Sequence, residues 1–355
     1  MMGRAIQVLV VDDSTFMRKS LSTMLASDRR IAIAGMARNG EEALQQVHAL
    51  RPDVVTMDVE MPGMNGLEAL KRIMAEHPVP VVMVSSLTTE GAGDTLKALE
   101  LGAVDYIAKQ LDGVATKIER IHDELIEKII AVSQAGEKVR AWATAPGRSA
   151  PRPRTALTAH SVSVTRGARL VAIGCSTGGP QALLEVLPGF PSDFPAPILI
   201  VQHMPKTFTK PFAERMNSIC SLEVKEAADG DELKPGRILI APGGLQCRVK
   251  RKSIMSNVVA LSPNFERHLH APSVDVMMQS VADVYEERGI AVILTGMGHD
   301  GLDGMRAVKA VNGRTIAQDE ATSIVYGMPK AVAEAGYADK VIPLFGVVGE
   351  ILNMV

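Results

Sequence analysis

The sequence predicts an α/β protein of two domains, each built on a mainly parallel β-sheet with helices on both faces. Three observations support this prediction. The chain of 355 residues is about twice the usual length of one domain. Short apolar runs rich in β-branched residues alternate with longer amphipathic stretches in both halves. A segment rich in proline, serine and arginine separates the two halves and lacks the apolar periodicity of a packed core.

The first half contains five candidate strands with helical patterns between them. The strands are expected at residues 6–11, 31–34, 54–57, 79–84 and 103–107. Continuous apolar strands separated by helices indicate a parallel sheet that is covered on both faces. A closing helix is predicted from apolar residues at 118, 121, 125, 129 and 132. We therefore expect a compact (βα)5 domain.

The linker and a second, larger sheet follow. Residues 136–168 carry few periodic apolar positions, and we interpret them as a solvated basic spacer rather than a contact for an acidic partner. Further strands are expected at residues 170–173, 197–201, 237–240, 258–261, 290–294, 314–317 and 340–343. Helical patterns at 273–288 and 301–311 lie between some of them, which favours a doubly wound, mostly parallel α/β sheet.

Composition excludes several classes of partner. The net charge of −2 and the pI near 6.5 argue against an electrostatic grip on nucleic acid or anionic lipid. The second half also shows no helix-turn-helix with a basic face, as a transcriptional output would need. No signal peptide is evident, and the apolar runs are far shorter than the roughly 20 residues that span a bilayer. Three widely spaced cysteines suit a reducing compartment, so we expect a cytoplasmic protein, monomeric and without membrane insertion.

Acidic residues follow two of the strands in the first half. Asp12 and Asp13 come after the first strand, and Asp58 comes after the third. The carboxyl ends of parallel strands meet at one edge, so three carboxylates gather there and favour a Mg²⁺ ion. Ser85 and Lys109 follow the next two strands and reach the same edge. One such acid alone is usually a helix cap or a solvated residue, but the five together suit phosphoryl transfer to Asp58.

These residues lie in motifs of a known family. The stretches "VLVVDDSTFMRKSL", "VVTMDVEMPGMNGLEALKRI", "VVMVSSLT" and "GAVDYIAK" resemble the flavodoxin-like receiver domain of two-component response regulators over roughly residues 5–125. The resemblance implies that Asp58 accepts a phosphoryl group from a histidine kinase. It further implies that Ser85 and Lys109 read this group and that Tyr106 is the switch aromatic. The implied Mg²⁺ ligands are Asp12, Asp13 and Asp58.

A glycine-rich corner, "GCSTGGP" at residues 174–180, joins a strand to a helix in the second half. Its spacing fits neither the phosphate loop G-x-x-x-x-G-K-[ST] nor the dinucleotide motif G-x-G-x-x-G. Phosphate binding by bare helix amides remains an alternative. The letters G-C-S-T-G match G-x-S-x-G, in which a tight turn exposes a serine. A serine nucleophile needs a base to take its proton.

Histidine and aspartate candidates for that role follow two other strands. His203 comes after the strand at 197–201 and Asp300 after the strand at 290–294, so both should share an edge with Ser176. Each has a simpler interpretation, His203 as a satisfied polar residue and Asp300 as a helix cap. Their joint placement favours a triad in the order Ser, His, Asp, which differs from the orders of the known serine hydrolases. The glycine-flanked backbone before Asp300 offers amides for an oxyanion.

Two rival chemistries use neighbouring residues. Cys175 is an alternative nucleophile, but as the neighbour of Ser176 it should point the opposite way, into the core. His268 and His270 suggest a zinc site, and His299 is a further candidate ligand. However, neither His299 nor any other residue lies at a spacing recognised for a third zinc ligand. Ester hydrolysis by the predicted triad needs no metal or other cofactor.

The second half also resembles a known family. The stretches "IGCSTGGP", "IVQHMP", "APGG", "PSVDVMMQSVA", "LTGMGHDG" and "QDEATSIVYGMPKAV" are similar, in the same order, to the catalytic domain of chemotaxis protein-glutamate methylesterases of the CheB type over roughly residues 168–352. The resemblance implies a Rossmann-like domain that hydrolyses glutamyl methyl esters on the cytoplasmic helices of chemoreceptors, and in some members deamidates receptor glutamines. It assigns nucleophile, base and acid to Ser176, His203 and Asp300. Further roles are implied for the Met297 amide in the oxyanion hole, for Thr177 beside the nucleophile and for His270 at the substrate entrance.

Together the two resemblances predict a phosphorylation-activated esterase. Residues 5–125 form the receiver, 126–167 the helix end and linker, and 168–355 the catalytic domain, with a chemotaxis histidine kinase as phosphodonor. The alternative is a receiver joined to a non-catalytic scaffold that binds receptor or kinase. Two positions depart from the family patterns: Gln110 stands where receivers usually have proline, and Gln246 where esterases often have histidine.

Overall fold

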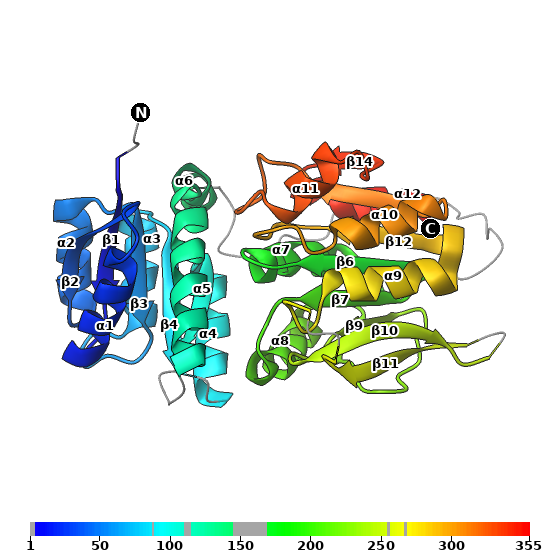
Figure 1. Ribbon diagram of the computed structural model, residues 1–355, viewed down its shortest axis with the longest axis horizontal. Helices are drawn as coiled ribbons and strands as arrows, with labels where there is room; N and C mark the ends of the chain where they lie inside the picture. The colour runs from blue at the N-terminus through cyan, green and yellow to red at the C-terminus, as the bar shows by residue number, and fades with distance from the viewer. Residues whose placement is uncertain (1–3, 87–88, 110–114, 145–168, 254–255, 266–267) are drawn as a thin grey trace. The chain divides into compact units, whose positions relative to one another are not determined.

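The computed structural model describes residues 4–86, 89–109, 115–144, 169–253, 256–265 and 268–355. The chain forms two compact units, Met1–Ala143 and Thr144–Val355, and Figure 1 shows the elements of each. Gln110 and most of the predicted linker lie outside the described residues. Within the described ranges, no helix combines the length and the hydropathy that a membrane crossing needs.

The first unit is built on a five-stranded parallel sheet, as the sequence predicts, in the order β2-β1-β3-β4-β5. Its strands are β1 (Ile6–Val11), β2 (Ile31–Ala37), β3 (Val54–Asp58), β4 (Val81–Ser86) and β5 (Asp105–Lys109). Its helices are α1 (Thr15–Ala26), α2 (Gly40–Leu50), α3 (Gly66–Glu76), α4 (Thr89–Leu101), α5 (Ala115–Ser133) and α6 (Gly136–Thr144). The strand order reverses between β1 and β3, so the residues that follow these strands border the crevice where such sheets bind ligands.

Local sequence explains how the helices begin. Ser14, Asn39 and Asn65 precede α1, α2 and α3, and the side chain of each accepts a hydrogen bond from an amide of the first turn. One expectation is wrong here, because the sequence predicts that the linker begins near residue 136, where the structure continues with α6. Val139 is 2% exposed in this helix, so the stretch packs an apolar side chain although it shows little apolar periodicity.

The second unit contains a seven-stranded sheet in the order β14-β13-β12-β6-β7-β9-β8, whose neighbouring strands all pair in parallel. Its strands are β6 (Leu170–Cys175), β7 (Ile198–Gln202), β8 (Glu223–Glu226), β9 (Arg237–Ile240), β12 (Gly289–Ile293), β13 (Arg314–Gln318) and β14 (Lys340–Ile342). A separate antiparallel pair consists of β10 (Leu245–Arg251) and β11 (Asn257–Pro263). The strand predicted at 258–261 therefore exists but does not belong to the large sheet.

The α-helices described in this unit are α7 (Gly179–Val186), α8 (Lys206–Ile219), α9 (Val274–Tyr285), α10 (Leu302–Ala310), α11 (Met328–Glu334) and α12 (Val347–Met354). Residues of α9, α10 and α11 share one core cluster with alternate strand residues such as Leu170 and Ala172 of β6. From β6 the chain builds the sheet toward β7 on one side, and from β12 toward β13 on the other. The carboxyl ends of β6, β7 and β12 therefore border the switch point, where an open α/β sheet binds its ligand.

Candidate functional site

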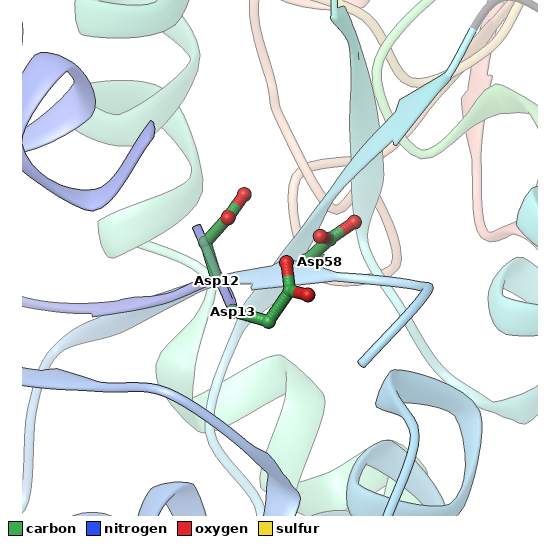
Figure 2. Close-up of side chains that lie close together, drawn as sticks. All are labelled: Asp12, Asp13 and Asp58. Carbon is green, nitrogen blue, oxygen red and sulfur yellow. The ribbon is translucent and has the colours of Figure 1, made fainter. Parts of the chain in front are cut away.

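Three aspartates form an acidic cluster at the carboxyl ends of β1 and β3 (Figure 2). Carboxylate oxygens of Asp12, Asp13 and Asp58 all lie within 4.8 Å of one another. Asp12 is fully buried, Asp58 is 4% exposed and Asp13 is exposed. Asp12 Oδ1 accepts a hydrogen bond of 2.9 Å from the Ser14 amide, which fixes the turn into α1. The structure thus brings together the three carboxylates that strand-end reasoning selected.

Lys109, at the end of β5, provides a positive charge in this cluster. Its Nζ lies 2.6 Å from Asp58 Oδ2 and 3.1 Å from Asp12 Oδ2. Burial raises the pKa of Asp58 to about 6 against the opposing effect of Lys109, and the charge of Asp12 adds to the rise. Burial alone would lower the pKa of Lys109, but Asp58 and Asp12 outweigh it and raise this pKa. Lys109 is therefore held as an ammonium beside a carboxylate that is costly to ionise.

The acidic cluster fits a hard divalent cation. Asp12 Oδ2 is buried and accepts no hydrogen bond of good geometry from the residues that the structure describes, although Lys109 Nζ lies 3.1 Å away. Three carboxylates face one ammonium, so negative charge is in excess. Oxygen ligands with one exposed member, Asp13, match the preference of Mg²⁺ for carboxylates together with retained water.

Ser85 and Tyr106 lie in the strands next to the acidic cluster. The Ser85 hydroxyl accepts a hydrogen bond of 2.6 Å from Thr95 Oγ1 and donates one of 3.2 Å to the Gly91 carbonyl, both in α4. Tyr106 is 4% exposed, and Lys128 Nζ lies 5.5 Å from the centre of its ring. Thr95 is not among the residues that the sequence predicts for this site, although it connects β4 to α4.

Ser176 lies at the turn between β6 and α7. Its amide donates a hydrogen bond of 3.0 Å to the Thr295 carbonyl, and its side chain is half-buried. Gly178 has φ of +76°, and a Cβ there would lie 2.7 Å from Ile324 Cβ and 3.1 Å from Thr295 Oγ1. A Cβ at Gly296 would lie 3.0 Å from Ser176 Cβ. The flanking glycines therefore permit both the left-handed turn and the close approach of the β12 loop.

His203 and Asp300 form the hydrogen-bonded pair that the sequence predicts. His203 Nε2 lies 2.8 Å from Asp300 Oδ2, and each side chain is 10% exposed. His203 Nδ1 is buried and has no hydrogen-bond partner among the described residues. Because Asp300 occupies Nε2, Nδ1 is the nitrogen left for the Ser176 hydroxyl. No hydrogen bond joins Ser176 Oγ to His203 in the described part of the chain, and such contacts often form only with substrate bound.

The Asp300 carboxylate also accepts hydrogen bonds from the N-terminus of α9. The donors are Ser273 Oγ at 2.9 Å, the Val274 amide at 2.8 Å and the Asp275 amide at 3.0 Å. Burial by itself would raise the pKa of Asp300, but His203 and these amides outweigh it and hold the pKa far below its ordinary value. Asp300 is thus an anion that can orient His203.

Asp275 makes the corresponding contact with the N-terminus of α10. Its Oδ1 accepts hydrogen bonds of 2.9 Å from the Gly301 amide and 2.7 Å from the Gly304 amide. We call this exchange, in which Asp300 caps α9 and Asp275 caps α10, the reciprocal caps. Burial raises the pKa of Asp275 to about 6, with Gly304 opposing the rise and the charge of Asp300 adding to it.

A buried glutamine joins the nucleophile to the base. Gln202, 2% exposed at the end of β7, donates through Nε2 to the carbonyls of Ser176 and His203, each at 3.1 Å. It is not among the residues predicted for the site. The available signal is its place directly before His203 at a strand end.

The remaining predicted residues lie around the pair. The rings of His270 and His203 are stacked, with centroids 3.9 Å apart and planes at 16°. Thr177 is 2% exposed, and its carbonyl accepts a hydrogen bond of 2.9 Å from Thr295 Oγ1. The Met297 amide donates no hydrogen bond within the described residues, so it can point at a substrate oxygen. Cys175 is fully buried, and burial raises the pKa of its thiol well above the ordinary value, which disfavours it as a nucleophile.

Comparisons with known proteins identify the family of each half of the chain. A family model described as CheB methylesterase matches residues 171–351, and one described as response regulator receiver domain matches residues 8–121. The chain is 50% identical to protein-glutamate methylesterase/protein-glutamine glutaminase 2 of Nitratidesulfovibrio vulgaris, covering 98% of this chain and 99% of the relative. It is 46% identical to the corresponding protein 1 of Oleidesulfovibrio alaskensis, with 99% of each chain covered. The crystal structure of the Thermotoga maritima CheB methylesterase catalytic domain matches with a TM-score of 0.52 and 43% identity, covering 53% of this chain and all of that domain.

Proposed function

Because the chain belongs to the CheB family of protein-glutamate methylesterases/protein-glutamine glutaminases, we propose that Ser176, His203 and Asp300 are its catalytic triad. The family's enzymes act on chemoreceptors in chemotaxis adaptation and are regulated by their receiver domain. The observation that carries the assignment is the 2.8 Å contact between His203 and Asp300, which lies past the strands β7 and β12 that flank the Ser176 strand.

In the proposed reaction, His203 Nδ1 takes the hydroxyl proton while Ser176 Oγ bonds to the glutamyl ester carbon. The C–O bond to the methoxy group then breaks, and methanol leaves with the proton from His203. A water molecule then attacks the acyl-enzyme with His203 again as base. The bond to Ser176 Oγ breaks, which leaves a glutamate side chain on the receptor and restores the Ser176 hydroxyl. With a glutamine side chain the leaving group is ammonia. Asp300 stays ionised: it holds the Nε2–H tautomer of the neutral His203 and stabilises the imidazolium that forms when Nδ1 takes the proton.

Three neighbours have supporting roles in this proposal. The Met297 amide donates to the oxyanion, supported by its lack of an acceptor among the described residues. Thr177 fixes the turn after the nucleophile through its bonded carbonyl. His270 stacks on His203 and limits rotation of the base at the substrate entrance.

The receiver is the proposed input. Asp58 accepts a phosphoryl group from the chemotaxis histidine kinase, and Asp12, Asp13 and Asp58 would hold the Mg²⁺ ion that this transfer needs. When bound, Mg²⁺ neutralises charge that develops on the phosphoryl oxygens. Lys109 pairs with the phosphorylated Asp58. Ser85 and Tyr106 change position in response to the phosphoryl group, and these changes alter the packing of β4, α4 and β5. We expect a monomer that acts in the cytoplasm on the cytoplasmic helices of the receptors.

The decisive experiment measures methanol release from a methylated chemoreceptor by wild type and by Ser176→Ala. We expect the variant to lose at least about 1,000-fold in kcat, as removal of a triad nucleophile does. Cys175→Ala, which changes the adjacent buried thiol, is the matched control and should keep most activity. Near-wild-type release by Ser176→Ala would exclude this triad. The rival scaffold function is tested by a serine-directed phosphonate, which would then fail to label Ser176 in the wild-type protein.

A further inference from the structure

Gln246, in β10, is a polar side chain that is only 1% exposed. Its amide makes three hydrogen bonds. Nε2 donates to the His270 carbonyl at 2.7 Å and to Asn264 Oδ1 at 3.1 Å, while Oε1 accepts from the Ser273 amide at 2.9 Å. One side chain therefore connects β10 to both ends of the segment that leads from β11 to α9.

Two of these partners contact the catalytic pair directly. The His270 ring is stacked on His203 at 3.9 Å, and Ser273 Oγ donates to Asp300 at 2.9 Å. The three bonds of Gln246 all go to this segment, and none of them reaches Ser176, His203 or Asp300. Gln246 therefore fixes the backbone of His270, which lies beside His203, and the backbone of Ser273, which lies beside Asp300.

The three bonds require an amide in one orientation. Two acceptors, the His270 carbonyl and Asn264 Oδ1, face the NH₂ group, and one donor, the Ser273 amide, faces the oxygen. A glutamate of the same shape would keep the bond from Ser273 but would turn a carboxylate oxygen toward two acceptors, and a buried mismatch of this kind is costly. A histidine offers one donor and one acceptor and so can replace at most two of the three bonds.

We propose that Gln246 is a positioning residue for the esterase reaction: by holding His270 and Ser273, it sets the alignment of His203 with Asp300. This inference rests on the proposed triad. It predicts that a change at Gln246 lowers the rate of the chemical step more than it lowers substrate affinity.

A control variant that affects the contact between β10 and α9 distinguishes a merely structural role of Gln246 from the proposed positioning role. The Ser280 hydroxyl in α9 accepts a hydrogen bond of 2.8 Å from the Val249 amide in β10, so it also ties β10 to α9, but this bond involves no residue of the pair. Ser280→Ala should lower the thermal unfolding midpoint and leave kcat unchanged.

The experiment compares full-length Gln246→Glu, Gln246→Ala, Gln246→His and Ser280→Ala with wild type. Steady-state methanol release from methylated receptor gives kcat and KM, and each variant is assayed well below its own unfolding midpoint. We expect Gln246→Glu and Gln246→Ala to lose about 10- to 100-fold in kcat with KM within about 2-fold, because small misplacement of catalytic groups has this effect. Gln246→His should recover most of that loss.

Unchanged kcat in Gln246→Ala and Gln246→Glu would overturn the inference. Equal loss of kcat in Ser280→Ala and Gln246→Ala at matched stability would overturn it too. If Gln246→Glu does not fold, the comparison of Gln246→Ala with Gln246→His still decides. Ser176→Ala, assayed in parallel, distinguishes failure of the proposed triad from failure of the role proposed for Gln246. An active Ser176→Ala excludes the triad. An inactive Ser176→Ala together with a fully active Gln246→Ala excludes only the role of Gln246.

Discussion

Asp300 combines a proposed catalytic task with a structural one. Its carboxylate accepts one hydrogen bond from His203 and three from Ser273 and the first amides of α9. The same bonds that stabilise the helix end keep the carboxylate ionised, because each favours the charged form. Loss of this charge should therefore affect activity and stability together.

For Asp300→Asn we expect kcat to fall about 10,000-fold, since an amide in place of the acid favours the wrong histidine tautomer in a triad. The free energy of unfolding should also fall by about 1–2 kcal/mol, because one amide NH₂ then faces donors of α9. Methanol release and urea unfolding measure the two effects. Ser273→Ala, which removes one donor and keeps the charge, should lose about 1 kcal/mol of stability, and its kcat should fall far less than that of Asp300→Asn. An Asp300→Asn variant with wild-type kcat would contradict the assignment.

Asp275 makes stability depend on pH. Its pKa is about 6 in the folded protein against an ordinary value of 3.8, so its ionisation costs folded-state stability above pH 6. That cost fades as pH falls from about 6 toward about 4, where the unfolded chain also becomes protonated. Asp275→Asn keeps an acceptor for Gly301 and Gly304 and should be about 1 kcal/mol more stable than wild type at pH 8, after allowance for solvent screening. Unfolding curves at pH 8 and pH 4.5 test this, and an equal difference at both values would refute it.

At the level of elements, the junction of β6 and α7 depends on a left-handed residue. Gly178 has φ of +76° and faces Ile324 and Thr295. An alanine there meets both a backbone penalty and a steric one, and the displaced turn carries Ser176.

Gly178→Ala should therefore lower the free energy of unfolding by more than about 2 kcal/mol and reduce esterase activity. Gly236→Ala is the matched control, since Gly236 has φ of +78° and a Cβ added there would meet nothing within 4 Å. It should cost only the backbone penalty of about 1–2 kcal/mol and leave kcat unchanged. Equal behaviour of the two variants in thermal unfolding and methanol release would show that the contacts with Ile324 and Thr295 do not matter.

The sequence predicts strands better than the contacts between distant loops. β1 and β9 begin and end at the predicted residues, because apolar runs bounded by polar residues define them clearly. The sequence does not predict β8, since its four residues "EVKE" contain one apolar side chain. It also misses β10, although Leu245, Cys247 and Val249 alternate with polar residues as strands do.

The residues of the site divide in the same way, into those that the local sequence predicts and those that only tertiary contacts reveal. Ser176 and His203 come directly after β6 and β7, and Asp300 follows β12 after a loop, so topology predicts that they lie at the same edge of the sheet. The role proposed for Gln246 depends on its hydrogen bonds to the His270 carbonyl and the Ser273 amide. These bonds are tertiary, and no local sequence pattern predicts them. Ser273 has a local signal, as a serine before a helix with an acid in its first turn, but its bond to Asp300 is tertiary.

At the level of the whole molecule, we propose the acidic cluster as the input and the esterase as the output. In this proposal, phosphoryl transfer to Asp58 changes the charge beside Lys109, at the ends of β3 and β5. Conversion of the esterase from almost wholly inactive to almost wholly active would need about 5.5 kcal/mol of differential stabilisation, and typical couplings of about 1–3 kcal/mol give partial control.

Full-length wild type given acetyl phosphate and Mg²⁺ should therefore release methanol about 5- to 150-fold faster than without them. Asp58→Asn should show the basal rate under both conditions, because it offers no carboxylate to phosphorylate. Chelation of Mg²⁺ should give the same basal rate in wild type, while leaving ester hydrolysis intact. Equal rates for wild type with and without phosphodonor would argue against control by phosphorylation.

The position of Ser176 has a practical consequence. Its main chain is bonded to Thr295, Gly179 and Gln202, whereas its hydroxyl makes no hydrogen bond to the described residues. Deleting the hydroxyl should thus silence the enzyme without loosening its architecture, unlike any change at Asp300. Ser176→Ala is accordingly the variant to use as bait: a folded decoy that holds methylated receptor long enough for the complex to be isolated.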